Sequence, residues 1–404
     1  MGKRLYFQGE FAKLVSELAP GDLFLCVQRR QEPSQPCAKE VLSMNTPAAA
    51  LSRKAPGDGR EPGLWLHSKQ WDLLYITGSS VLVVLPLMLY AVVGHSALFV
   101  NLFIAGVIGG PHMYATFFRT LLDPSFRQRH RLLVIGSLGI PVLVVAGAVW
   151  AFQLLMTLFF FWASIHVLHQ IAYILECYER KQHGHPQRWS LVIDYAVVFS
   201  SLYPFASYRF IHDDFYIGKT LLLYPDMLKM PIVFYTISGF FALAFFLFIG
   251  KTIREIQQGT VHYPKILLTV TTIGLAFFIT SYSGNRLEIA FQGFNTWHSF
   301  QYLALTWYIN TLRKQRGTIE ARGIPWLSNL GASRLSCFYG LNVACTLGAL
   351  LLIGVVFRLS GLTFEHSYYI VVLSFLLIHY CHDHVLFTQF GDLVPQAEGA
   401  GERH

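Results

Sequence analysis

Three side chains that can bind a metal ion lie close together near the end of the chain, within Ser374–Phe387. His379, His382 and Asp383 are spaced as i, i+3 and i+4, so a helix places them on one face. The segment lies in an apolar run from about Tyr368 to Phe390, which is long enough to cross a bilayer as a helix. Polar groups at that depth are costly, so they usually face the interior of a helix bundle and have a function. The alternative is a hydrogen-bonded patch that joins helices.

Further histidines occur in three other apolar segments. One follows Gly109-Gly110-Pro111, two repeat the i, i+3 spacing, and one stands among aromatic residues. The candidate metal ligands are, in chain order, His112, His166, His169, His298, His379, His382 and Asp383. The alternatives are a kink-capping role for the histidine after Pro111 and interhelical hydrogen bonds for the others.

All four segments are even-numbered among the predicted membrane spans, so they run parallel to one another. If the middle of each span is the bilayer centre, three of the histidines lie within roughly 3 Å of the midplane and the other three about 6 Å nearer the cytoplasm. The sequence therefore predicts one layer of imidazole groups and a carboxylate.

Imidazole with carboxylate is a ligand set for iron, zinc, copper or manganese. Without a thiolate it suits non-haem iron(II) that keeps positions open for O2, and zinc is the alternative. Six histidines exceed the needs of one open site. We therefore expect either one or two bound ions, with surplus histidines orienting the ligands.

Aromatic side chains surround this layer. They indicate an apolar pocket for a lipid-like or isoprenoid small-molecule substrate that enters from the bilayer, and ordinary core packing is the alternative. The candidate pocket residues are Phe161, Trp162, Trp297, Tyr302 and Tyr380.

The composition is typical of a polytopic membrane protein, because 53% of the residues are hydrophobic and only 13% are charged. The formal net charge of +8 does not indicate a nucleic-acid partner, since the basic residues form short clusters between apolar runs. The six cysteines form no CxxC pair, which argues against cysteine chemistry.

About ten apolar runs have membrane length, and they predict an all-α bundle of transmembrane helices. The runs are Leu73–Val93, Leu98–Phe118, Leu132–Trp150, Phe152–Tyr178, Leu191–Phe210, Ile232–Gly250, Ile266–Ser283, Ile289–Leu312, Leu335–Phe357 and Tyr368–Phe390. Lysine and arginine are concentrated in alternate connections, which places both termini in the cytoplasm. We expect a multi-pass protein of the bacterial inner membrane.

Three regions are expected along the chain. Residues 1–70 form a mostly disordered tail, residues 71–390 the membrane domain, and residues 391–404 a C-terminal tail. Leu5–Gly9 resembles a protease-recognition tag and Met44 is a natural start, so residues 1–43 are candidates for non-native sequence.

The order of the histidine segments resembles that of the Brp/Blh-type β-carotene 15,15′-dioxygenases. The shared features are Pro-His early, Ile-His in a later span, a single histidine among aromatics, and a histidine followed closely by aspartate in the last span. The matched positions are His112, His166, His298 and His379, with Asp383 near the last. The resemblance implies a polytopic membrane protein in which histidines on separate helices hold iron and which cleaves a carotenoid to retinal.

Together these features predict a membrane metalloenzyme that uses O2 to oxidise or cleave an apolar substrate. Three alternatives remain open from the residues alone. They are a zinc-dependent lipid hydrolase, a haem-binding electron carrier, and a proton-coupled transporter that uses the histidines as a relay.

Overall fold

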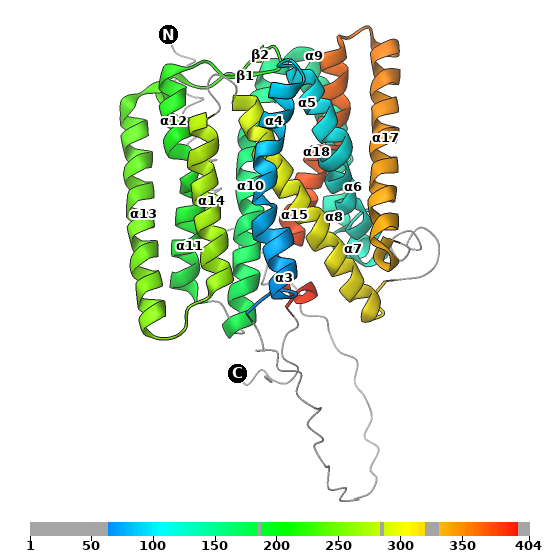
Figure 1. Ribbon diagram of the computed structural model, residues 1–404. Helices are drawn as coiled ribbons and strands as arrows, with labels where there is room; N and C mark the ends of the chain where they lie inside the picture. The colour runs from blue at the N-terminus through cyan, green and yellow to red at the C-terminus, as the bar shows by residue number, and fades with distance from the viewer. Residues whose placement is uncertain (1–63, 184–186, 283–286, 320–330, 395–404) are drawn as a thin grey trace, which may run out of the picture. The chain divides into compact units, whose positions relative to one another are not determined.

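The computed structural model describes residues 64–183, 187–282, 287–319 and 331–394, all within one compact unit that spans residues 61–404. The described chain is mostly helical (Figure 1). The expected N-terminal tail, including the tag-like segment, and the expected C-terminal tail lie almost wholly outside the described residues. Residues 69 and 70 of the expected tail already belong to the first helix.

Every predicted apolar run coincides with a helical segment. The α-helices are α3 (Lys69–Trp71), α4 (Leu85–Val92), α5 (Ala97–Ile104), α6 (Gly110–Arg119), α7 (Pro124–Arg129), α8 (Arg131–Ser137), α9 (Ile140–Trp150), α10 (Phe152–His183), α11 (Arg188–Ser201), α12 (Tyr203–His212), α13 (Pro231–Gln257), α14 (Tyr263–Tyr282), α15 (Leu287–Gln315), α17 (Leu335–Ser360) and α18 (Phe364–Leu386). The remaining turns are the π-helical η1 (Asp72–Thr77) and η3 (Ala105–Gly109) and the 3-10 segments η2 (Gly78–Val84), η4 (Asp226–Lys229) and η5 (Phe390–Asp392).

Eight helical segments in the described part of the chain are long and apolar enough to cross a membrane. This supports a multi-pass membrane protein. Two helices that the hydrophobic pattern also predicted as spans, α14 and α15, are not among the eight. In α15 the reason is composition, because the helix buries a series of polar side chains against its neighbours. These are Thr296, His298, Ser299, Gln301, Thr306 and Asn310.

Prolines divide several spans into two helices. Pro111 lies just after the π-helical turn η3, and the ring cannot donate the hydrogen bond that a regular helix needs there. Pro141 and Pro204 lie in the first turns of α9 and α12, directly after breaks in their spans. The breaks therefore fall where the missing N–H groups require them.

The first span is irregular and is held by side chains of α15. The carbonyl oxygen of Ile76, in η1, accepts hydrogen bonds from Trp297 Nε1 at 3.1 Å and from Gln301 Nε2 at 2.5 Å. Neighbouring side chains thus satisfy a backbone group in the bundle interior, as a membrane environment demands. Gly293 permits the close approach, since a Cβ there would lie 2.5 Å from the carbonyl oxygen of Val83.

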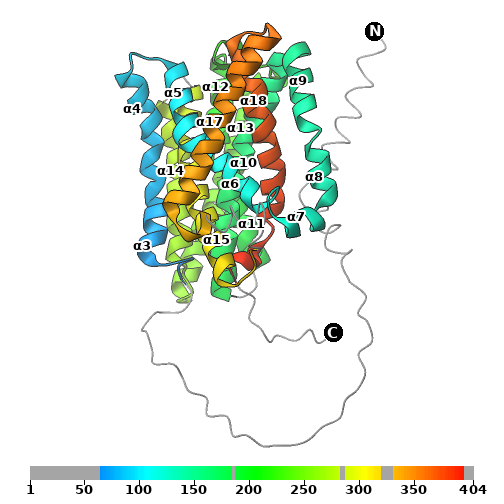
Figure 2. The ribbon, with the colours of Figure 1, turned by 90° about the vertical axis from the view of Figure 1, so that its right-hand side faces the viewer.

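Helices α6, α10, α15 and α18 form the centre of the bundle. Contacts join α6 to α15 and α18, and join α10 to the same two helices, so the four close a ring. Helices α11 to α14 lie to one side of α10 in Figure 1, and α17 lies on the other side, against α6 and α18 (Figure 2). The four helices in the ring are the ones that carry the candidate ligands.

The two ends of the described chain lie beside the C-terminal end of α10. Lys181 Nζ donates to the carbonyl of Leu66 at 2.7 Å, and the guanidinium of Arg180 lies 4.1 Å from the ring centre of Phe390. The opposite end of the bundle carries a short antiparallel hairpin of β1 (Tyr216–Ile217) and β2 (Thr220–Leu221) (Figure 1).

Candidate metal centre

Four buried histidines, one from each helix of the central ring, converge on one place. They are His112 on α6, His166 on α10, His298 on α15 and His379 on α18, and none is more than 4% exposed. The ring centres of His112 and His379 are 4.8 Å apart, and those of His166 and His298 are 5.0 Å apart. The predicted layer of imidazoles is therefore a compact cluster.

Asp383 completes the cluster. It lies one turn beyond His379 and is fully buried. Its Oδ2 is 3.5 Å from His379 Nε2 and 3.8 Å from His166 Nε2. We use the name histidine cluster for His112, His166, His298, His379 and Asp383.

The inward-facing atoms of the histidine cluster have no hydrogen-bond partner in the described part of the chain. These atoms are His112 Nε2, His166 Nε2, both ring nitrogens of His298, His379 Nε2 and Asp383 Oδ2. Leaving a buried polar atom unpaired costs about 1–3 kcal/mol. A fold that only needed interhelical hydrogen bonds would pair these atoms with one another or with the backbone.

Hydroxyl groups fix the orientation of several cluster residues. Thr116 Oγ1 lies 2.6 Å from His379 Nδ1, donates to Asp383 Oδ1 at 2.9 Å, and lies 2.6 Å from the Tyr302 hydroxyl. The Tyr302 hydroxyl in turn donates to Asp383 Oδ1 at 2.6 Å. In metal sites such outer contacts on one nitrogen or oxygen aim the other atom at the ion.

His112 is held in the same way. Its Nδ1 lies 2.9 Å from Ser299 Oγ and also contacts the carbonyl oxygen of Gly109, in the π-helical turn. The kink-capping interpretation and the ligand interpretation are therefore compatible, because Nδ1 contacts the kink while Nε2 stays free.

The donor atoms fit a transition-metal ion. In two overlapping sets, His112, His298 and His379, and then His166, His379 and Asp383, the possible ligand atoms lie within 4.8 Å of one another. Ligands at about 2.1 Å from an ion are about 3–4 Å apart, so small adjustments bring either set into coordination range. His379 belongs to both sets, which allows one ion or two adjacent ions.

Two of the predicted ligands, His169 and His382, are not part of the cluster. His382 turns toward α8, where Nε2 lies 3.1 Å from Ser137 Oγ, and its Nδ1 lies 3.0 Å from Thr120 Oγ1. His169 is half-buried, and its ring lies 5.3 Å from that of His384. Side chains at i and i+3 lie close together on a helix but do not point in the same direction. Here helix packing directs the first histidine of each pair into the bundle and the second away from the cluster.

The predicted pocket residues have different surroundings. Trp297 is fully buried and donates a hydrogen bond to the Ile76 carbonyl, and the Tyr302 hydroxyl donates one to Asp383. Trp162 is 44% exposed on the outside of the bundle. Phe161 lines a small apolar pocket between α10, α12 and α15. Tyr380 alone lines the larger pocket beside the cluster, and its ring stacks on that of His166 at 4.1 Å.

This larger pocket, which we call the interhelical pocket, lies between α6, α10, α15, α17 and α18. Its empty volume is about 1080 Å³, a value that includes the solvent-filled space at its open mouth. His112 and Tyr380 line it at the histidine cluster, and Ile217 and Glu288 line it toward the hairpin. The pocket therefore connects the histidine cluster with the end of the bundle that carries the hairpin.

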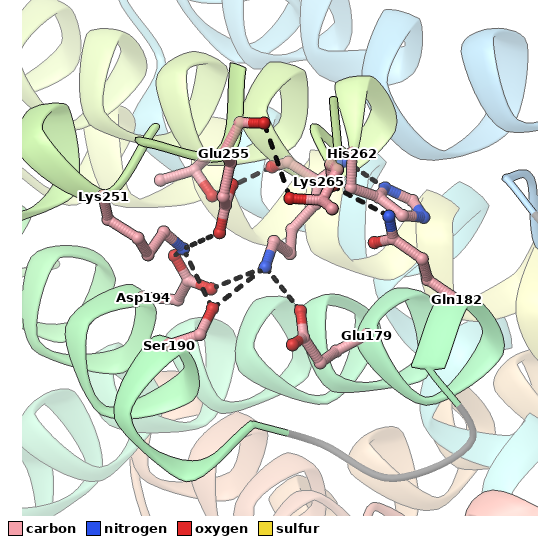
Figure 3. A network of polar contacts seen from close by, with 10 residues as sticks. Glu179, Gln182, Ser190, Asp194, Lys251, Glu255, His262 and Lys265 are labelled. Carbon is pink, nitrogen blue, oxygen red and sulfur yellow. Dashed lines mark hydrogen bonds and ion pairs between the residues drawn. The ribbon is translucent and has the colours of Figure 1, made fainter. Parts of the chain in front are cut away.

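A second buried polar cluster lies in α10, α11, α13 and α14, and the sequence did not indicate it. The ammonium of Lys251 contacts Asp194 Oδ1 and lies 3.7 Å from Glu255, while that of Lys265 lies 2.5 Å from Glu179 and 3.2 Å from Asp194 (Figure 3). We call these five residues the charged cluster. Both lysines lie near helix ends beside connections between apolar runs, yet they are only 4% and 2% exposed.

Comparison with known proteins gives no relative for this chain: no protein family, curated protein or solved structure matches it. The chemistry of the site is therefore argued from its residues.

Proposed function

We propose that the protein is an integral membrane metalloprotein in which the histidine cluster holds one ion or two adjacent ions. One observation carries this proposal: four buried imidazoles and a carboxylate from four helices point unpaired atoms at one another. A bound ion pairs these atoms and removes the cost of their burial.

The proposed membrane topology has ten spans, with α14 and α15 added to the eight apolar segments, and both termini in the cytoplasm of a bacterial cell. An even number of spans agrees with the two ends of the described chain lying beside the same end of α10. The density of lysine and arginine in alternate connections supports the same orientation.

The proposed ion is iron(II), and the proposed reaction is an O2-dependent oxidation or cleavage of an apolar substrate. Neither ligand set contains a cysteine, and imidazole with carboxylate suits non-haem iron. Iron in such a site supplies O2 activation when it is bound. The chain supplies ligand atoms held by Thr116 and Ser299, and a buried site from which bulk water is excluded.

The four-segment resemblance to β-carotene dioxygenases is consistent with this proposal. Its four matched positions, His112, His166, His298 and His379, are the histidines of the cluster, whereas His169 and His382 have no counterpart in the resemblance and lie outside it. The carotenoid substrate itself stays an expectation.

Nitric oxide binding to the iron(II)-loaded protein tests the proposal. Nitric oxide binds at open positions on non-haem iron(II). The product gives a high-spin electron paramagnetic resonance signal, which an iron site without open positions does not give. We expect this signal in the wild-type protein and in His382→Ala, and its loss in His298→Ala. Stoichiometric zinc with no nitric oxide signal would instead support the hydrolase alternative and would exclude the oxygenase.

A further inference from the structure

The interhelical pocket has one polar wall in an otherwise apolar surround. Asn295 Nδ2 donates to Gln292 Oε1 at 3.2 Å, and Gln292 Nε2 donates to Asn101 Oδ1 at 2.9 Å, so three amides form a ladder between α5 and α15. All three line the pocket. The facing walls are aromatic or aliphatic, with Phe159 and Phe160 on α10 as examples.

The ladder leaves hydrogen-bonding capacity for a ligand. Within the described residues, Asn295 Oδ1 and Asn101 Nδ2 make no hydrogen bond, which leaves one acceptor and one donor at the pocket. The hydroxyl of Tyr114, which also lines the pocket and is 6% exposed, has no partner there either. The two amides are half-buried and the Tyr114 hydroxyl is buried, so a ligand that supplies the missing partners is favoured.

The charge of the lining excludes a phosphate group. Among the described residues that line the pocket, none is a lysine or an arginine. The acidic side chain at the wall, Glu288, accepts a hydrogen bond from the backbone N–H of Gly218 in the hairpin at 2.6 Å. An anionic headgroup would therefore enter an apolar space without a cation, which is strongly unfavourable.

The dimensions favour an elongated molecule. Both Tyr369 and Tyr380 line the pocket, and they are eleven positions apart, which corresponds to about 16 Å along α18. The hairpin residue Ile217 lines the end away from the histidine cluster and is buried. The space thus runs lengthwise between helices, from the hairpin to His112.

We propose that the interhelical pocket binds a neutral, long-chain lipid whose uncharged hydroxyl or carbonyl group is hydrogen-bonded by the ladder of Asn101, Gln292 and Asn295. The apolar body of the lipid packs against the aromatic and aliphatic walls and reaches His112 and Tyr380. This inference names the substrate class of the proposed oxygenase. That the bound lipid is a substrate rests on the proposed function. Binding itself does not depend on the metal.

Photolabelling of the purified protein in detergent tests the inference. The probes are a long-chain alcohol, the corresponding alkane and the corresponding phosphocholine lipid, each with a diazirine and an alkyne in the chain. Ala349 lines the pocket on α17, and Ala344 on the same helix is exposed. We expect Ala349→Phe to reduce labelling by the alcohol at least tenfold and Ala344→Phe to leave it unchanged.

A second variant tests the hydrogen bonds of the amide ladder. Asn295→Leu keeps the size of the side chain and removes its hydrogen bonds, so labelling by the alcohol should fall about fivefold to tenfold while labelling by the alkane is unchanged. If Ala349→Phe does not fold, Val372→Phe fills the same pocket from α18.

Three outcomes would overturn the inference: equal labelling of Ala349→Phe and Ala344→Phe, equal loss of alcohol and alkane labelling in Asn295→Leu, or stronger labelling by the phosphocholine lipid. The metal content of each preparation separates the two proposals. A labelled pocket in a protein that binds no metal would leave the lipid site standing and remove the oxygenase.

Discussion

The two buried polar clusters differ in how their atoms are paired. In the charged cluster each lysine ammonium lies against two carboxylates, with Asp194 shared between them (Figure 3). In the histidine cluster the inward-facing nitrogens and Asp383 Oδ2 make no hydrogen bond in the described part of the chain, and the cluster contains no lysine or arginine to balance the carboxylate.

This difference separates a structural role from a binding role. In the charged cluster, ion pairs between lysines and carboxylates join α10, α11, α13 and α14 within the protein. Unpaired ligand-type atoms that are aimed at one another by Thr116 and Ser299 are arranged for a group that is bound from outside. Damage to the first cluster should therefore affect folding, and damage to the second should affect metal binding.

The largest expected effect is on the charged cluster. Asp194→Asn removes the carboxylate that both lysines share, and breaking a buried ion pair costs about 3–5 kcal/mol. Thermal unfolding in detergent should show a large drop in stability, whereas the metal content of the remaining folded protein should not change. Asp226→Asn, at an exposed position in η4, is the control. A variant that kept its stability but lost its metal would reverse the assignment of the two roles.

The next effect concerns the orientation of the ligands. Thr116→Val removes the hydroxyl that contacts His379, Asp383 and Tyr302, so metal affinity should weaken about 10- to 100-fold. Titration with a competing chelator measures this change. Thr120→Val, at the residue that follows α6, removes a contact with His382 and a hydrogen bond to the backbone carbonyl of Thr116, and it should leave the affinity unchanged. Similar losses in both variants would mean that the hydroxyl acts through packing.

A smaller effect is expected where α15 packs on the first span. The Cβ of Gly293→Ala would meet the backbone carbonyl of Val83 at 2.5 Å, so α15 must shift at a cost of about 1–3 kcal/mol. Because α15 carries His298, the variant should lose both stability and metal affinity. Gly274→Ala on α14, where a Cβ meets no atom within 4 Å, should lose neither. Chemical unfolding measures the stability of both variants, and metal titration measures their affinity.

The smallest effect lies outside both clusters, at the connection between α6 and α7. Burial acts to raise the pKa of the Asp123 carboxyl, but the Arg313 guanidinium and hydrogen bonds from Ser125 and Phe126 hold that pKa below its usual value. A lowered pKa in the folded state adds stability above the unfolded pKa of about 4, and this stability is lost as the pH falls further. Asp123→Asn keeps the helix cap but loses the ion pair with Arg313, so it should cost about 1 kcal/mol at neutral pH, and its melting temperature should approach that of the wild type in acid. A constant difference at all pH values would contradict this.

The helices and the layer of ligands could be predicted from the sequence. Long apolar runs fix where the helices form, and the depth of a histidine follows from its place in a run, which is why His112, His166, His298 and His379 were expected at one level. The rotation of each helix could not be predicted in this way. It depends on packing against neighbours, and that packing turns His382 toward Ser137 and Trp162 out of the bundle.

Other parts of the site give no strong signal in a single sequence. Thr116 and Ser299 are small hydroxyl residues of a kind that is common in membrane helices, so their role is visible only when their contacts are known. The charged cluster has one feature in the sequence that could have indicated it. Glu179 and Asp194 stand at the ends of their spans nearest the lysine-bearing connections, and that juxtaposition could have indicated a buried pairing.

Metal content per chain is the most direct test of the histidine cluster as an ion site. Elemental analysis should compare the wild type with two double variants, His298→Ala/His379→Ala and His169→Ala/His382→Ala, all purified without chelators. We expect one or two ions per chain in the wild type and in the second variant, and none in the first. Wild-type protein without stoichiometric metal, or a first variant that retains it, would show that the histidine cluster does not hold an ion.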